Sequence, residues 1–278
     1  MIRVCVAGAT GWAGRAIVDG ILASDDLVLA SGVARSGTGH DLGLALGGAR
    51  LDVTLLATVP EAVAAGMDVL VEYTSHASVK ANVMAALEAG VAVVVGSSGL
   101  TADDDEEIDA LARRRSVGVI AAGNFSITAA MAQAAALLVA PFLPHAEIID
   151  LAAAEKPDAP SGTARELAQR LGAIRAASTD PAGRVPAGGS GGSEADLARG
   201  LTVAGIPVHS VRLPSFSVST EVIFGLPDER LTIRHDAGSS AAPYVAGTLL
   251  AVRLVGGRVG LTRGLDTLLL GSARTGPA

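Results

Sequence analysis

One segment places a lysine beside a turn of small residues that could bind a charged group. Residues 148–171 read IIDLAAAEKPDAPSGTARELAQRL, in which Lys156 precedes the turn and an amphipathic run follows it. The segment contains no histidine and no cysteine. Any chemistry here therefore depends on Lys156 and on the backbone N–H donors of the turn.

A second segment has the glycine spacing of a nucleotide-binding turn. Gly8, Gly11 and Gly14 form G-x-x-G-x-x-G after the β-branched run 2–6 and before an alanine-rich helical pattern. A pyrophosphate requires a close approach of the backbone, and the N–H groups of a helix N-terminus meet its charge. The same glycines could simply open a helix, but the strand–turn–helix context favours a dinucleotide.

The residues after the second strand decide which dinucleotide fits. A site for NAD usually ends this strand with Asp or Glu, which binds the ribose 2′-hydroxyl. No carboxylate occurs between Leu27 and His40, whereas Arg35 and Ser36 could hold a 2′-phosphate. The sequence therefore predicts NADPH, with NADH binding more weakly. The alternative is that Arg35 is only a solvated loop charge.

Alternating strand and helix patterns must position the glycine turn. Short apolar runs alternate with helical patterns over residues 1–124, which predicts an α/β fold with a parallel, doubly wound sheet. The strands are expected at 2–6, 27–34, 68–74, 91–99 and 117–124, and helices at 78–89 and 101–115. We therefore assign residues 1–124 to a dinucleotide-binding domain.

The pattern changes after Asn124. The sequence predicts a helix over 127–139, a strand over 146–154, a mobile glycine- and proline-rich loop over 181–193 and a helix over 243–255. Three extended runs are expected to be neighbouring antiparallel strands of a second sheet, at 205–214, 217–225 and 229–237. We assign 125–242 to a smaller α/β domain, with 243–278 packing back on the first domain.

Composition limits the classes of partner. The net charge of −7 argues against nucleic acid and anionic membranes. Cys5 is the only cysteine, which excludes a disulfide within the chain and fits a reducing compartment. No apolar stretch reaches the roughly 18 residues of a membrane-spanning helix. The sequence therefore predicts a cytoplasmic protein, with a small molecule as its ligand and no metal site.

Seven separated segments resemble dihydrodipicolinate reductases, in the order seen in that family: VAGATGWAGRA, VEYTSHASV, VVVGSSGL, GNFSI, EKPDAPSGTA, GIPVHSVRLP and EVIFG…ERLTIRHDA. Members of the family make tetrahydrodipicolinate on the lysine and diaminopimelate route. The resemblance covers nearly the whole chain. It implies an N-terminal Rossmann domain, a smaller α/β substrate and oligomerisation domain with a mostly antiparallel sheet, and a homotetramer joined through the substrate-domain sheets.

The resemblance also implies roles for single residues. Lys156 would face the substrate as the catalytic-site cation, and Ser161, Gly162 and Thr163 would hold a substrate carboxylate. Together with Arg35 and Ser36, the cofactor-binding residues would be Gly8, Thr10, Gly11, Trp12, Ala13, Gly14, Tyr73, Thr74, Gly96, Ser97, Ser98, Asn124 and Phe125.

This sequence departs from the family pattern ahead of the lysine. The family has acid-x-His-His-x-x-Lys, with a histidine as proton donor, whereas Ala152 and Ala153 stand at the histidine positions here. The family's D-F-T is also E-Y-T, with Thr74 as its last residue. Lys156, Glu155 or water could supply the proton instead, or the protein could be a non-catalytic relative. The chain retains five other histidines: His40, His76, His145, His209 and His235.

Reaction chemistry suggests a further interpretation. Reducing a conjugated imine requires a proton delivered by a positioned acid. A simple iminium already carries its proton, so hydride transfer alone gives the amine. We therefore expect an NADPH-dependent reductase of a carboxylate-bearing imine. The alternatives are a reductive aminase or amino-acid dehydrogenase on the same scaffold, and a nucleotide-binding regulatory protein without turnover.

Overall fold

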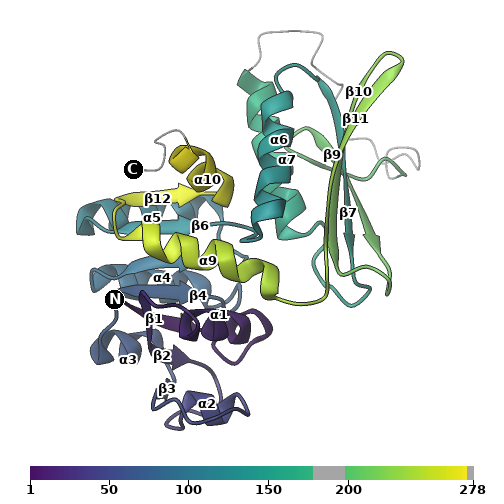
Figure 1. Cartoon of the computed structure of the whole chain (residues 1–278). Coiled ribbons are helices and arrows are strands. Elements are labelled where there is room, and N and C mark those ends of the chain that lie inside the picture. Colours follow the sequence, from purple (N-terminus) through teal and green to yellow (C-terminus); the bar gives the residue numbers. More distant parts are fainter. Residues whose placement is uncertain (178–197, 274–278) are drawn as a thin grey trace. The chain divides into compact units, whose positions relative to one another are not determined.

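The computed structural model describes residues 1–177 and 198–273. The chain forms two compact units, Met1–Ile127 together with Ala241–Ala278 (unit 1) and Thr128–Ser240 (unit 2). Figure 1 shows the helices and strands of both units. In the described ranges, no helix is long and apolar enough to cross a membrane. The predicted loop 181–193 lies outside the described residues.

Unit 1 is built on a seven-stranded sheet in the order β12-β6-β5-β4-β1-β2-β3, and all its pairings are parallel. Its strands are β1 (Ile2–Ala7), β2 (Leu27–Val33), β3 (Leu55–Leu56), β4 (Val69–Glu72), β5 (Ala92–Val95), β6 (Gly118–Ala121) and β12 (Gly260–Arg263). β1 lies between β2 and β4, so the order of the strands reverses there. Ligands of open α/β sheets bind at this kind of switch point, beyond the carboxyl ends of the strands.

Helices cover both faces of this sheet, which is why its strands are apolar on both sides. They are α1 (Trp12–Leu22), α2 (Leu42–Ala45), α3 (Val59–Ala65), α4 (Val79–Glu88), α5 (Ala102–Arg115), α9 (Ala242–Val255) and α10 (Leu265–Ala273). One core lies between the strands and α3, α4 and α5. α9 packs against α1 and the central strands. At the start of α5, a capping box between Thr101 and Asp104 satisfies two terminal N–H groups.

Unit 2 is built on a five-stranded sheet in the order β11-β10-β7-β9-β8. Its elements are α6 (Ile127–Val139), β7 (His145–Ala152), α7 (Gly162–Ala177), β8 (Leu201–Val203), β9 (Ile206–Arg212), β10 (Val218–Leu226) and β11 (Glu229–Ala237). β7 and β9 are parallel, and the other pairs are antiparallel. α6 and α7 cover one face of the sheet, with Ile148 and Phe224 buried beneath them (Figure 1).

These two sheets confirm the predicted fold class. The predicted neighbourhood of the three extended runs is wrong in one respect, because β7 lies between β9 and β10. The chain leaves β7, forms α7, and returns as β9 in the same direction, so these two strands pair in parallel and β10 takes the other side of β7. The short strands β3, β8 and β12 were not predicted, because runs of two to four residues carry too little periodicity.

Candidate active site

The glycine turn after β1 requires glycine at two positions, because any other residue there would force the backbone to shift. Gly8 has a φ of +84°, and a Cβ atom there would overlap the carbonyl of Tyr73. A Cβ atom on Gly14 would overlap the carbonyl of Gly8. The N–H of Gly11 donates to the Gly8 carbonyl at 2.9 Å and closes the turn. The turn therefore presents bare backbone, as an approaching pyrophosphate requires.

The N-terminus of α1 keeps its positive end uncompensated. Gly11 is the N-cap and has no side chain to bond the first N–H groups, and the first turn contains no acidic residue. These N–H groups and the helix dipole favour a bound anion. Trp12 is exposed, and its ring lies edge-on to that of Tyr244, 5.6 Å away. Thr10 and Ala13 lie in the same turn, and the Thr10 carbonyl accepts a bond from Arg15.

The end of β2 lies beside this turn. The Val33 carbonyl accepts N–H bonds from Gly8 at 2.8 Å and from Ala9 at 3.2 Å. Arg35 and Ser36 follow after one residue, Ala34, and are exposed. Within the described part of the chain, Arg35 forms no hydrogen bond or ion pair. An exposed cation is thus available next to the glycine turn, where an adenosine ribose would extend.

A packed aromatic residue shapes the neighbouring strand ends. The ring of Tyr73 covers Gly96, where a Cβ atom would overlap it, and lies 6.2 Å from the ring of Phe125. Its hydroxyl lies 3.1 Å from the Thr248 hydroxyl. Burial raises the pKa of Tyr73 far above its ordinary value, so the phenol stays protonated at neutral pH. Tyr73 therefore contributes an uncharged, packed side chain at these strand ends and not an ionised group.

Glu72 is a site residue to which the sequence analysis assigned no role. It is fully buried at the end of β4, and its Oε1 accepts bonds from the hydroxyl and N–H of Thr74 and from the amide of Asn82. Asn82 also bonds the Thr74 hydroxyl at 3.3 Å. Among described residues, Glu72 Oε2 has no partner. Glu72 and Asn82 together fix Thr74. The E-Y-T departure was a signal for Glu72, whereas Asn82 had none in the sequence.

The remaining predicted cofactor residues follow β5 and β6. Ser97 has a buried hydroxyl without a partner among the described residues, whereas Ser98 is exposed. The Asn124 side chain accepts the N–H of Ser126 at 2.8 Å, and Phe125 is buried beside it in sequence. Because parallel strands end at one edge of a sheet, unit 1 gathers all the predicted cofactor residues there.

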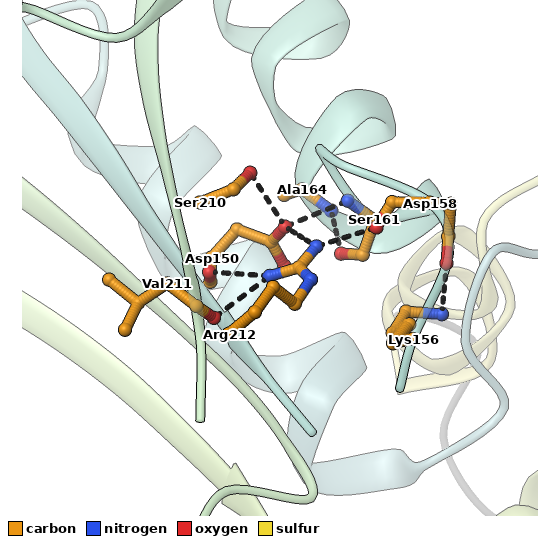
Figure 2. Close-up of polar contacts among 8 residues, drawn as sticks. All are labelled: Asp150, Lys156, Asp158, Ser161, Ala164, Ser210, Val211 and Arg212. Atoms are coloured by element: carbon orange, nitrogen blue, oxygen red, sulfur yellow. Dashed lines mark hydrogen bonds and ion pairs between the residues drawn. The ribbon is translucent and has the colours of Figure 1, made fainter. Parts of the chain in front are cut away.

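In unit 2, a buried acid holds the turn that follows Lys156 (Figure 2). Asp150 on β7 is fully buried. Its Oδ2 accepts bonds from the Ser161 N–H at 2.8 Å, the Ser210 hydroxyl at 3.2 Å and Arg212 Nη2 at 2.7 Å. One carboxylate thus joins β7, β9 and the start of α7.

Arg212 completes this attachment from β9. Its Nη1 donates to the carbonyls of Asp150 and Val211, each at 3.0 Å, and its Nη2 also donates to the Asp158 carbonyl at 2.6 Å. The Arg212 side chain is 16% exposed, and removing one partner of such a buried ion pair costs about 3–5 kcal/mol. Asp150 and Arg212 could not be assigned this role from the sequence, because each depends on a partner far away in the chain.

Ser161 immediately precedes α7 and bonds inward. Its N–H donates to Asp150, and its hydroxyl accepts the N–H of Ala164 at 3.3 Å, as an N-cap does. Both groups had been expected to face a carboxylate ligand, and in the structure both bond to the protein. Gly162 and Thr163 follow on the first turn of the helix. Ser161 therefore fixes the position of the segment between Lys156 and α7.

The side chain of Lys156 is paired with Asp158, as Figure 2 shows. Lys156 Nζ lies 2.7 Å from Asp158 Oδ1. Burial raises the pKa of Asp158. Lys156 and a hydrogen bond from the Gly162 backbone lower it by more, so the pKa lies below its ordinary value. A carboxylate therefore already lies between the lysine and the N-terminus of α7.

The two alanines that precede the lysine lie at the end of β7. Ala152 is buried and pairs with Val218 and Arg212, and Ala153 is half-buried.

No described histidine belongs to a group of His, Cys, Asp and Glu residues that could hold a metal ion. His209 Nε2 lies 2.9 Å from Glu147, and His76 is exposed.

A parallel sheet whose first strand ends in a glycine turn, in a chain with a second unit built on a mixed sheet, is the architecture expected of an NAD(P)H-dependent reductase. Residues 2–125 match the family described as "Dihydrodipicolinate reductase, N-terminus", and residues 124–269 match "Dihydrodipicolinate reductase, C-terminus". The chain belongs to the dihydrodipicolinate reductase family.

Similar proteins cover the chain almost completely. It is 37% identical over 271 residues to the 4-hydroxy-tetrahydrodipicolinate reductase of Moorella thermoacetica, with 96% of this chain and 98% of the relative covered. The enzyme of the same name from Thermosynechococcus vestitus is 38% identical over 277 residues, with coverage of 96% and 97%. The dipicolinate-bound dihydrodipicolinate reductase of Paenisporosarcina sp. TG-14 superposes with a TM-score of 0.75 at 28% identity, covering 96% of this chain and 99% of that one.

Proposed function

We propose that this protein is an NADPH-dependent reductase of an imine that bears a carboxylate, similar to 4-hydroxy-tetrahydrodipicolinate reductase. The observation that carries the proposal is the position of Asp158. Its carboxylate contacts both Lys156 and the backbone of Gly162, which are the groups expected to hold a substrate carboxylate. A carboxylate therefore fits this pair of donors, and the carboxylate of a substrate replaces that of Asp158.

The turn itself supports recognition of a substrate rather than a purely structural role. Asp150 and Arg212 hold the turn from inside, whereas the side chain of Lys156 bonds Asp158 and not a strand of the sheet. The Lys156 side chain is 30% exposed and is free to change partners. Such preorganisation lowers the cost of ordering the donors when a ligand binds.

Unit 1 supports a dinucleotide as the cofactor. Gly8 and Gly14 leave space that a Cβ atom would fill, and the α1 N-terminus offers unpaired positive charge. Arg35 would hold the 2′-phosphate of NADPH, with NADH bound more weakly. A nicotinamide bound there would supply the hydride. Residues 1–124 with 243–278 would form the dinucleotide-binding domain, and 125–242 the substrate domain.

The chain's own residues bind and orient the substrate. Lys156 would pair with the carboxylate, Gly162 and Thr163 would complete its binding, and Tyr73 would stay neutral beside the nicotinamide site because its pKa is raised. The alanines at 152 and 153 remove the family's histidine donor. A simple iminium already carries the proton that such a donor supplies, so we propose this class of substrate.

A turnover assay tests the proposed function. The full chain is mixed with NADPH and a panel of cyclic and acyclic imino acids that includes 4-hydroxy-tetrahydrodipicolinate, and NADPH oxidation is followed. We expect the highest kcat/KM with a simple carboxylate-bearing imine. Turnover that requires added ammonia would instead indicate a reductive aminase, and NADPH binding without any turnover would indicate a regulatory protein.

The double variant Ala152→His with Ala153→His tests the part played by the missing histidines. We expect it to raise activity on 4-hydroxy-tetrahydrodipicolinate strongly. If the parent protein already reduces that compound at least as well as every simple imine, the simple-imine proposal is wrong, although the reductase assignment stands.

We further propose that the protein is a homotetramer joined through the sheets of unit 2. Ile149 and Ile223 alternate with the buried Ile148 and Val222, so they lie on the sheet face away from the helices and are only half-buried. Light scattering after gel filtration should give four times the mass of the 27.6 kDa chain. A monomer at micromolar concentration contradicts this assembly.

A further inference from the structure

A small cavity lies within unit 2 next to the turn that follows Lys156. Its volume is about 20 Å³, and it lies between α6, α7, β10 and β11. The lining residues are Ala129, Ala132, Gln133, Thr163, Leu167, Thr220, Val222, Ile233 and His235. Thr163 lies on the first turn of α7, and Thr220 and His235 are half-buried.

Gln133 gives this cavity a polar end. The residue is only 8% exposed, and its Nε2 is buried without a hydrogen-bond partner among the described residues. A buried amide that lacks a partner costs about 1–3 kcal/mol, so folded proteins rarely retain one without a ligand or a water to bond it. The donor therefore requires an acceptor from outside the protein chain.

The chemistry of the walls limits what that acceptor is. The lining residues are uncharged alkyl, hydroxyl and amide groups together with His235. His235 Nε2 lies 3.0 Å from the Thr128 hydroxyl, and burial lowers the pKa of the ring, which keeps it neutral. A carboxylate would lose its hydration here without a cation to replace it. About 20 Å³ is enough for one water-sized group.

We propose that this cavity is a substrate subsite that receives one uncharged oxygen, a hydroxyl or a carbonyl, as hydrogen-bond acceptor for Gln133. The inference rests on the proposed function, because Thr163 links the cavity to the carboxylate-binding turn. One substrate would then bear a carboxylate at the turn and a neutral oxygen in the cavity. Gln133 is a specificity-determining residue that selects oxygenated substrates over otherwise equal ones.

Stable aromatic acids test the subsite without any turnover. Picolinate carries the carboxylate alone, and its 4-, 5- and 6-hydroxy derivatives add a neutral oxygen at different ring positions. Titration calorimetry on the full chain compares their dissociation constants in the parent, in Gln133→Leu and in Gln133→Asn, whose shorter amide withdraws the donor. Gln169→Leu is the matched control, because Gln169 is exposed on α7.

We expect at least one hydroxypicolinate to bind about tenfold more tightly than picolinate, the ratio set by one buried hydrogen bond. This preference should vanish in both Gln133 variants and persist in Gln169→Leu, while picolinate binding stays unchanged throughout. If picolinate binds but no derivative is preferred, or the preference survives Gln133→Leu, the subsite is wrong and the proposed function stands. If picolinate itself fails to bind, the carboxylate turn and the subsite fail together.

Discussion

The ammonium group of Lys156 lies 2.7 Å from the carboxylate of Asp158, two residues further along the chain. The same carboxylate accepts a hydrogen bond from the backbone of Gly162 at the start of α7. An acidic side chain of the protein thus occupies the two donors proposed for the substrate carboxylate. Under the proposed function, binding of the substrate would exchange one carboxylate for another.

Replacing Lys156 with methionine separates pairing from proton donation. We expect the KM of a carboxylate-bearing imine to rise about tenfold to hundredfold, because a hydrogen bond to a charged group is lost, while kcat changes little. Lys80→Met is the matched control, since Lys80 is the other lysine of the chain and pairs with Asp104 and Glu107. A fall in kcat of about 10²- to 10⁴-fold with loss of a limb of the pH profile would identify Lys156 as a proton donor instead.

Replacing Asp158 with asparagine removes the internal carboxylate. We expect picolinate to bind about threefold to tenfold more tightly, because it no longer displaces a hydrogen-bonded anion. Asp228→Asn serves as the control, since Asp228 is exposed in the turn between β10 and β11. Titration calorimetry measures both variants. Weaker binding of picolinate to Asp158→Asn would show that Asp158 positions Lys156 and does not compete with the ligand.

Replacing Arg35 with alanine tests the choice of cofactor. We expect NADPH affinity to fall about tenfold or more, the scale of a charge-assisted bond to a phosphate, and NADH affinity to change little. Fluorescence titration of both cofactors provides the measurement. Arg50→Ala is the control, because Arg50 is also exposed in unit 1 and pairs with Asp52. Equal affinity of the parent for NADPH and NADH contradicts the prediction before any variant is made.

Replacing Gly14 with alanine tests the glycine turn. The new Cβ atom would overlap the Gly8 carbonyl, so the backbone must shift away from the position that meets a pyrophosphate. We expect NADPH affinity to fall by at least about tenfold, on the scale of one lost anion contact. Gly48→Ala is the control, because the atom nearest to a Cβ there lies 3.6 Å away. Unchanged NADPH binding in Gly14→Ala would remove the turn from the cofactor site.

Asp104 links the stability of unit 1 to pH. Hydrogen bonds to Lys80 and Thr101 lower its pKa from 3.8 to about 2. Because the pKa is lower in the folded state, the stabilisation is fully present above about pH 4 and is lost as pH falls through about 2. We expect Asp104→Asn to lower the free energy of unfolding by about 1 kcal/mol at pH 7, with a difference that shrinks toward pH 2.

Urea denaturation at pH 7 and pH 3 measures this effect. The matched control is Asp103→Asn, because Asp103 lies in the same first turn of α5 but is exposed and forms no hydrogen bond with a described side chain. If both variants lose the same stability, the contribution comes from the helix dipole alone and the capping box adds nothing.

The sequence by itself determined local features in each of the two units. The turn formed by Gly8 and Gly14 could be predicted, because a missing Cβ atom affects only the backbone of the turn that contains it. The strand and helix patterns up to Asn124 could be read because each face of an element repeats with its own period. The turn after Lys156 was identified for the same reason, since a helix N-terminus is a property of a few consecutive residues.

Only the tertiary structure decided which groups of that turn bind inward. Arg212 and Asp150 are 62 residues apart in sequence and meet because β9 returns beside β7. Asp150 also accepts the N–H of Ser161, so this group bonds to the protein, and Lys156 forms its ion pair with Asp158. Gln133 had no signal in an alanine-rich helix, because an amide without a partner is defined by everything packed around it. Periodicity and sterics act along the chain, whereas a partner across a sheet depends on the order in which all its strands assemble.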